Sequence, residues 1–209
     1  TGDVGEVGIR GENVTQGYES NPEANAKAFT HGWFRTGDLG SLDADGYLFL
    51  KGRIKEIINR AGEKISPREV DEVLLDHPAI DQVVTFAAPH TLLGEDVAVA
   101  VVLKDGESVT EQAIKEFAAQ RLADFKIPRV VLFLDEIPKG PTGKRQRIGL
   151  AEKLGLTASD PTADRPAYAA PRTPVEETLV SIWSEVLDVT SIGIEDNFFQ
   201  LGGDRKSVV

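Results

Sequence analysis

The segment that decides the fold is residues 52–72, GRIKEIINRAGEKISPREVDE, where the pattern of the chain changes from strand-like to helical. Ser66 is a candidate helix N-cap, Pro67 stands at the first helical position, and Glu69 completes a capping-box pattern. Apolar residues then recur at helical spacing up to His77. The segment therefore predicts a helix that begins at Pro67 and follows a β-rich region.

The region before this segment, residues 1–53, is predicted to be β-rich. GEVGIRG (5–11) and GYLFLKG (46–52) are short apolar-rich runs bounded by glycine, and Asp45-Gly46 is a hairpin signal. GWFRTGDLG (32–40) lies between them and is punctuated by glycine. We predict that it is a loop.

The region after the segment alternates between helical and strand-like patterns. Strands are predicted at 81–88, 97–103 and 129–134, and a second amphipathic helix at 110–125. The order helix, strand, strand, helix, strand indicates an α+β fold, with helices packed on a small sheet. We assign residues 54–156 to this subdomain.

Residues 157–173 contain Pro, Ala, Thr and Asp without periodicity, which is typical of a linker. A new helix is predicted from Pro174, with Thr173 as its N-cap and Glu176 closing a capping box. Its apolar stripe needs a partner, yet few residues follow it. Residues 174–209 are therefore expected to be the first part of another domain.

Composition excludes several classes of protein. The net charge of -11 disfavours binding to nucleic acid or to an anionic membrane, and no apolar run is long enough to span a bilayer. The chain has no Cys, and its three His lack ligand spacing, so neither a disulfide framework nor a zinc site is expected. These features fit a cytoplasmic protein. The absence of Met and the strand-like opening suggest a fragment.

Three motifs are candidates for chemistry. Asp38 in FRTGDLG has a carboxylate suited to a ribose diol, although local chemistry alone favours a turn Asp that bonds to its own backbone. Residues 51–64 hold five basic side chains: Lys51, Arg53, Lys55, Arg60 and Lys64. Such a group suits a polyphosphate ligand, and the alternative is a solvated basic edge of the fold.

The third motif is PKGPTGKRQR (138–147), a tight loop that presents Lys144. A lysine in such a loop is suited to stabilising developing negative charge, and the alternative is a basic surface turn. The loop is not a P-loop, because Pro138 replaces the first glycine and Arg145 follows the lysine. Residues 126–147 carry net +4 in an acidic chain, which favours an anionic ligand.

Taken in this order, GEVGIRGENVTQGY, FRTGDLG, GRIKEIINRAGEKISPREVDE and PTGKRQR resemble the adenylate-forming family, which includes acyl-CoA synthetases and the adenylation domains of nonribosomal peptide synthetases. The resemblance covers residues 1 to about 155. It implies that residues 1–53 end a large adenylation domain and that residues 54–156 form its mobile C-terminal subdomain. The phosphate loop and acyl pocket of the family lie before Thr1, so the fragment alone is expected to be inactive and the acid is not identified.

The resemblance also implies roles for five residues. Asp38 would bind the ribose hydroxyls of AMP, with Arg53 near the nucleotide. Lys55 would be the hinge between the two parts, and Gly62 would lie at the pantetheine tunnel. Lys144 would be the catalytic lysine that bridges the substrate carboxylate and the phosphate, with ATP and Mg²⁺ as the implied reactant and cofactor.

Residues 173–204 resemble the start of a peptidyl carrier domain, an all-α helix bundle, and end in NFFQLGGD. In that family a serine carrying 4'-phosphopantetheine follows Gly-Gly-Asp, but here Arg205 follows Asp204. Three explanations are open: a natural loss of the serine, use of Ser207 instead, or a modified serine between Asp204 and Arg205 that a standard sequence omits. We favour the third.

The leading hypothesis is part of a nonribosomal peptide synthetase that activates a carboxylic or amino acid as acyl-AMP and loads it on its own carrier. Its partners would be the carrier, a phosphopantetheinyl transferase and downstream modules. The alternatives are an acyl-CoA ligase-like enzyme that uses free CoA, and a non-catalytic docking module.

Overall fold

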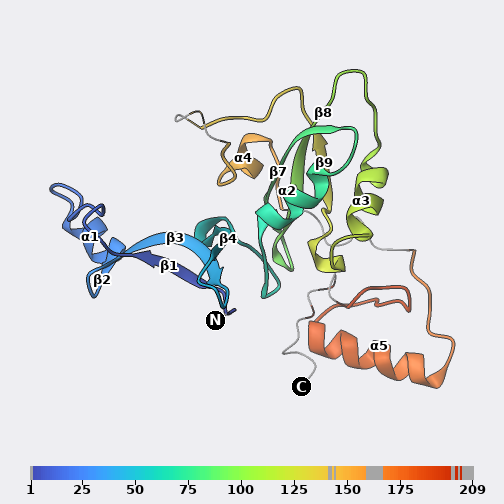
Figure 1. The fold of residues 1–209 in the computed structure, drawn as a ribbon. Helices are drawn as coiled ribbons and strands as arrows, with labels where there is room; N and C mark the ends of the chain where they lie inside the picture. Colours follow the sequence, from blue (N-terminus) through green and yellow to red (C-terminus); the bar gives the residue numbers. More distant parts are fainter. Residues whose placement is uncertain are drawn as a thin grey trace.

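The computed structural model describes residues 2–140, 143, 145–158, 167–198, 201 and 203. Figure 1 shows a β-rich N-terminal part, a central α/β part and a C-terminal segment dominated by one long helix. Lys144 and residues 204–209 lie outside the described residues.

The N-terminal part is a four-stranded antiparallel sheet built around β3 (Trp33–Leu42). β3 pairs with β1 (Gly5–Ile9), β2 (Phe29–Thr30) and β4 (Leu48–Arg53), and α1 (Pro22–Ala28) precedes β2. The predicted strands are present, but the predicted loop at 32–40 is wrong, because most of it is β3. Gly37 interrupts the regular strand with a φ of +72°. The glycines of residues 32–40 therefore indicate an irregular strand rather than a loop.

The central part is a second sheet in which β8 (Gly94–Leu103) lies between β7 (Ile80–His90), which is antiparallel to it, and β9 (Val130–Phe133), which is parallel. A short hairpin of β5 (Ile58–Arg60) and β6 (Glu63–Ile65) joins the start of β8 through the pair Arg60–Gly94. The remaining elements of this part are η1 (Ile54–Glu56), α2 (Pro67–Leu75), α3 (Glu111–Ala119), η2 (Asp124–Lys126) and α4 (Leu150–Lys153). The predicted order of helices and strands is confirmed.

The core lies on both faces of β8. Val97, Val99 and Val101 point to one face and are fully buried with residues of α2 and α3. Ala98 and Ala100 point to the other face and pack with Ile137 and Leu150, so α4 covers that face. Burial on both faces explains why β8 reads as a continuous apolar run. The second helix ends earlier than predicted, at Ala119, and residues 124–126 form the separate turn η2.

Helix α2 begins at Pro67 as predicted, but its capping box does not form. Ser66 stands at the N-cap without a side-chain cap hydrogen bond. Its hydroxyl instead donates to the Lys51 carbonyl at 2.6 Å, and Glu69 accepts from Lys126 Nζ at 2.6 Å. Both capping groups therefore make tertiary contacts, and Ser66 ties α2 to β4.

The C-terminal helix α5 (Pro174–Leu187) has the complete capping box predicted for Thr173 and Glu176. After it the chain folds back, because Trp183 contacts the Phe198 ring with centroids 5.0 Å apart. A side chain at Gly203 would meet that same ring at 2.2 Å, so the glycine is required for this packing. A carrier bundle is not shown, since α5 is the only helix described beyond residue 166.

Candidate functional site

Asp38 and Arg53 form an ion pair across neighbouring strands. They are register partners on β3 and β4, with Arg53 Nε 2.9 Å from Asp38 Oδ1. The Arg53 side chain is 64% exposed, so this pair contributes little to stability and Arg53 can leave Asp38 at low cost. A carboxylate accepts several hydrogen bonds, which leaves Asp38 with capacity for a ligand hydroxyl.

The backbone around Asp38 is held in place from β1. The Thr36 hydroxyl donates to the Val7 carbonyl at 2.8 Å and accepts from the Asp38 amide at 3.0 Å. Glu6 accepts from the Gly37 amide at 3.2 Å and pairs with Arg35. The Asp38 side chain pairs with Arg53 of the neighbouring strand, which differs from the alternative of a turn Asp that bonds to its own backbone.

Lys55 lies in η1, the single turn that joins the two sheets. It borders a cavity of about 350 Å³ together with residues 87–89, 94–95 and 147–149. The described structure gives Lys55 no ion-pair partner, whereas its neighbours Arg53 and Glu56 are both paired. The turn connecting the two parts is therefore short and fixed on both sides of Lys55.

Gly62 is at the tip of the β5–β6 hairpin. Ala61 and Gly62 both have positive φ, +47° and +91°, which is the geometry of a tight hairpin turn. The Ala61 amide donates to the Leu93 carbonyl at 3.0 Å, and a side chain at Gly62 would meet nothing within 4 Å. The turn is therefore anchored at its base and open at Gly62.

The base of the Lys144 loop is visible even though Lys144 lies outside the described residues. Lys139 and Arg145 form an isolated antiparallel bridge that closes the loop. Two residues later, Arg147 is mostly buried and binds three groups. Its Nε is 3.1 Å from Glu56 Oε2, one terminal nitrogen donates to the Thr85 carbonyl at 2.8 Å, and the other to Asp71 Oδ2 at 2.5 Å.

Asp71 completes this cluster from the buried face of α2. Its other oxygen accepts from the Thr85 amide at 2.7 Å. Burial raises the pKa of the Asp71 carboxyl, and the hydrogen bond and positive charge of Arg147 partly oppose that rise. Sequence reasoning missed Glu56, Asp71 and Arg147. The available signal was an Asp beside apolar positions of an amphipathic helix, which needs a buried partner.

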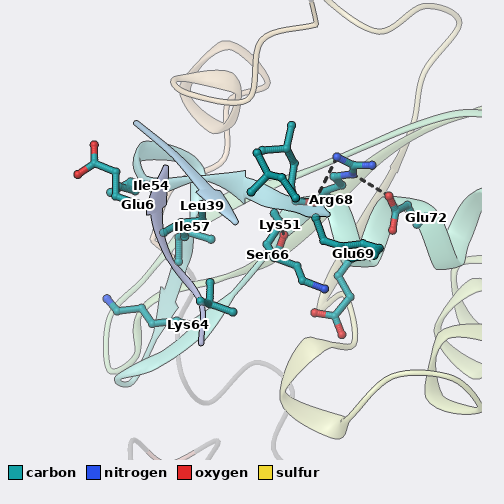
Figure 2. Close-up of a pocket in the computed structure, with 14 residues that line it drawn as sticks. Glu6, Leu39, Lys51, Ile54, Ile57, Lys64, Ser66, Arg68, Glu69 and Glu72 are labelled. Carbon is teal, nitrogen blue, oxygen red and sulfur yellow. Dashed lines mark hydrogen bonds and ion pairs between the residues drawn. The ribbon is translucent and has the colours of Figure 1, made fainter. Parts of the chain in front are cut away.

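The predicted basic group at 51–64 does not form one site. Arg53 pairs with Asp38, and Arg60 pairs with the buried Asp96 at 2.8 Å. Lys51 and Lys64 border a larger groove of about 1220 Å³, which Figure 2 shows between the first sheet and α2. That groove is lined by acidic and basic side chains and by apolar side chains that are about half exposed: Leu48, Phe49, Leu50 and Ile54.

Neither a cluster of metal ligands nor a membrane-spanning helix is present among the described residues. They contain no group of three or more His, Asp or Glu side chains placed to hold a metal ion. None of the described helices combines the length and apolarity needed to cross a membrane.

Comparison with known proteins places these features in a family. Residues 69–144 match the C-terminal domain of AMP-binding enzymes. The chain is 56% identical over 143 residues to an oxalate–CoA ligase of Arabidopsis thaliana, a match that covers 68% of this chain and 28% of the relative. The chain belongs to the adenylate-forming family. The predicted resemblance to this family is thereby confirmed.

Two further matches agree with membership of the adenylate-forming family. A probable CoA ligase of Humulus lupulus is 52% identical over 166 residues, covering 79% of this chain and 31% of the relative. The structure of o-succinylbenzoate CoA synthetase from Bacillus subtilis, in complex with an acyl-adenylate intermediate, has a TM-score of 0.66 at 34% identity, covering 71% of this chain and 30% of that chain. The chain spans about a third of the length of the curated relatives it matches.

Proposed function

We propose that the protein containing this chain is an AMP-forming acid–thiol ligase. A carboxylate oxygen would attack the α-phosphorus of ATP and release pyrophosphate, giving an acyl-AMP. A thiol would then attack the acyl carbon, and AMP would leave as the thioester forms. The observation that carries the proposal is the Asp38–Arg53 pair at the end of β4, immediately before the η1 turn, within a chain similar to CoA ligases.

The residues fit two reactions at one site. Asp38 would accept hydrogen bonds from the ribose hydroxyls, and Lys144 would stabilise the charge that develops at the phosphate during adenylation. Residues 54–156 would then rotate about Lys55, so that Gly62 replaces Lys144 at the site and admits a pantetheine thiol. A short connecting turn in which Lys55 has no ion-pair partner among the described residues supports its assignment as the hinge.

Free CoA is the acceptor favoured by the relatives, which are CoA ligases. We therefore place acyl-CoA formation first. The test is incubation of the full-length protein with ATP, CoA and a panel of carboxylic acids that includes oxalate, followed by mass spectrometry. Acyl-CoA and AMP formed together with one acid support the proposal, and the absence of both for every acid contradicts it.

A carrier acceptor is the second candidate, favoured by the segment after residue 166. The capped helix α5 and the packing of Phe198 against Trp183, with Gly203 close to the Phe198 ring, support one folded unit in this segment. The attachment position lies outside the described residues, both between Asp204 and Arg205 and at Ser207. Mass-spectrometric peptide mapping of residues 197–209 decides it. Phosphopantetheine on a serine after Asp204, or on Ser207, would identify a working carrier, whereas a direct Asp204–Arg205 peptide with unmodified Ser207 would exclude one.

A further inference from the structure

The η1 turn lies between two ion pairs that anchor it to different parts of the molecule. On its N-terminal side, Arg53 binds Asp38 of the first sheet. On its C-terminal side, Glu56 binds Arg147, which follows the Lys144 loop. Lys55 lies between them. A rotation between the two parts of the molecule would use the backbone of this turn. That backbone is held at one end by a contact to the first sheet and at the other end by a contact to the central part.

The two anchors differ in strength. Arg53 is 64% exposed, whereas Arg147 is 19% exposed and Glu56 is 28% exposed. Partial burial reduces solvent screening, so the Glu56 contact is the stronger of the two. Rotation that breaks the weaker contact leaves Glu56 attached to the subdomain.

Arg147 also fixes Glu56 to rigid elements. Its guanidinium reaches the backbone of β7 at Thr85 and the carboxylate of Asp71 on α2. The planar guanidinium holds three acceptors in fixed directions, which a lysine does not do. Glu56 is therefore connected through one side chain to strand β7 and to the buried face of helix α2.

We propose that Arg147 is a positioning residue that makes the end of the hinge and the base of the Lys144 loop one rigid body. This inference rests on the proposed function. Motion is then confined to residues 53–55, and the Lys139–Arg145 bridge, whose second residue lies two positions before Arg147, moves in fixed register with Glu56. Loss of the Glu56–Arg147 contact would make the two end positions of the rotation less precise and would leave the substrate-binding groups unchanged.

The test uses Glu56→Ala in the full-length protein, because this variant keeps the Arg147–Asp71 pair and the core intact. Hydrogen exchange followed by mass spectrometry should show exchange in residues 54–59 faster by about fivefold, the effect expected for one ion pair of this kind, with β7 and β8 unchanged. Glu56→Gln, which retains a neutral acceptor, should show a smaller effect. Glu72→Ala, which breaks the exposed Arg68–Glu72 pair at 2.7 Å, is the matched control.

Kinetics give the second readout. Glu56→Ala should lower kcat for thioester formation about fivefold, with KM values for ATP and the acid within about twofold of the wild type. Unchanged exchange in residues 54–59, or a change in KM alone, would overturn the positioning role. Hydrogen exchange does not depend on catalysis. A wild-type protein with no ligase activity would therefore contradict the proposed function, and the hydrogen-exchange result would still decide the positioning role of Arg147.

Discussion

Asp38 and Arg53 face each other across β3 and β4 with 2.9 Å between Oδ1 and Nε, and the next residue after Arg53 begins the turn that leads to the second sheet. The proposed nucleotide contact and the proposed hinge are thus adjacent in the chain. Under the proposed function, a ligand that draws Arg53 from Asp38 would act directly on the turn and so connect occupancy of the site to the position of the subdomain.

Replacing Asp38 should weaken nucleotide binding more than catalysis. Asp38→Ala removes the acceptor for the ribose hydroxyls and leaves Arg53 unpaired, so we expect KM for ATP to rise about tenfold, which corresponds to about 1.4 kcal/mol, the scale of a hydrogen bond to a charged group. Steady-state kinetics of the full-length protein measure it. Asp45→Ala, in the exposed β3–β4 turn, is the control, and an equal KM for both variants would remove Asp38 from the site.

Replacing Lys144 should abolish the first half-reaction. Lys144→Ala removes the charge that we propose stabilises the phosphate in the transition state, and loss of such a group lowers the rate by roughly 10²–10³-fold. Acid-dependent pyrophosphate exchange is the measurement. Lys139→Ala is the control at the base of the same loop, because Lys139 is an exposed lysine that pairs with Glu136. Full exchange activity in Lys144→Ala would show that another group performs this role.

Stiffening the hinge should separate the two half-reactions. Lys55→Pro fixes φ at position 55 and disfavours the helical conformation of Ile54 before it, whereas Lys55→Ala leaves the backbone free. We expect the proline variant to lower thioester formation at least about tenfold more than adenylation, since only the former requires rotation. Equal losses in both half-reactions would argue against Lys55 as the hinge.

Stability should fall at mildly acidic pH because of His90. Burial lowers the pKa of His90, an effect that Asp96 opposes and that Arg129 and Arg60 reinforce. The stabilising contribution is present above the unfolded pKa of about 6.5 and is lost as pH falls through the lower folded pKa. Thermal unfolding at about pH 7.5 and about pH 5.5, on either side of the unfolded pKa, tests this.

The matched variants for this measurement are His90→Asn and His31→Asn. The asparagine side chain introduced by His90→Asn would still accept from the Leu92 and Leu93 amides, which in the wild type donate to His90 Nδ1 at 3.2 and 3.1 Å. We expect the drop between the two pH values to be smaller in His90→Asn and unchanged in His31→Asn, because the His31 side chain is exposed. An identical drop in all three proteins would contradict the shift at His90.

Local features of the fold followed from the sequence, whereas long-range contacts did not. The Thr173–Glu176 capping box formed because both partners lie within one turn. The same pattern at Ser66 gave the correct start of α2 but the wrong hydrogen bond, since the Lys51 carbonyl is brought to Ser66 by the packing of β4. Neighbours in the sequence therefore predict an N-cap better than they predict its partner.

The candidate site shows the same division. Asp38 and Arg53 were identified by motif, but their pairing depends on strand register. Arg147 and Asp71 are 76 positions apart, and no local pattern indicates that they meet. The loop predicted at 32–40 became a strand because pairing with β1, β2 and β4 outweighed the turn preference of its glycines.

The most direct test of the account is acid-dependent exchange of labelled pyrophosphate into ATP by the full-length protein. The account predicts exchange that requires one carboxylic acid and is independent of CoA, because acyl-AMP forms before the thiol reacts. Exchange with no acid, or none with any acid while the protein remains folded, would contradict the assignment of this chain to an acid-activating ligase.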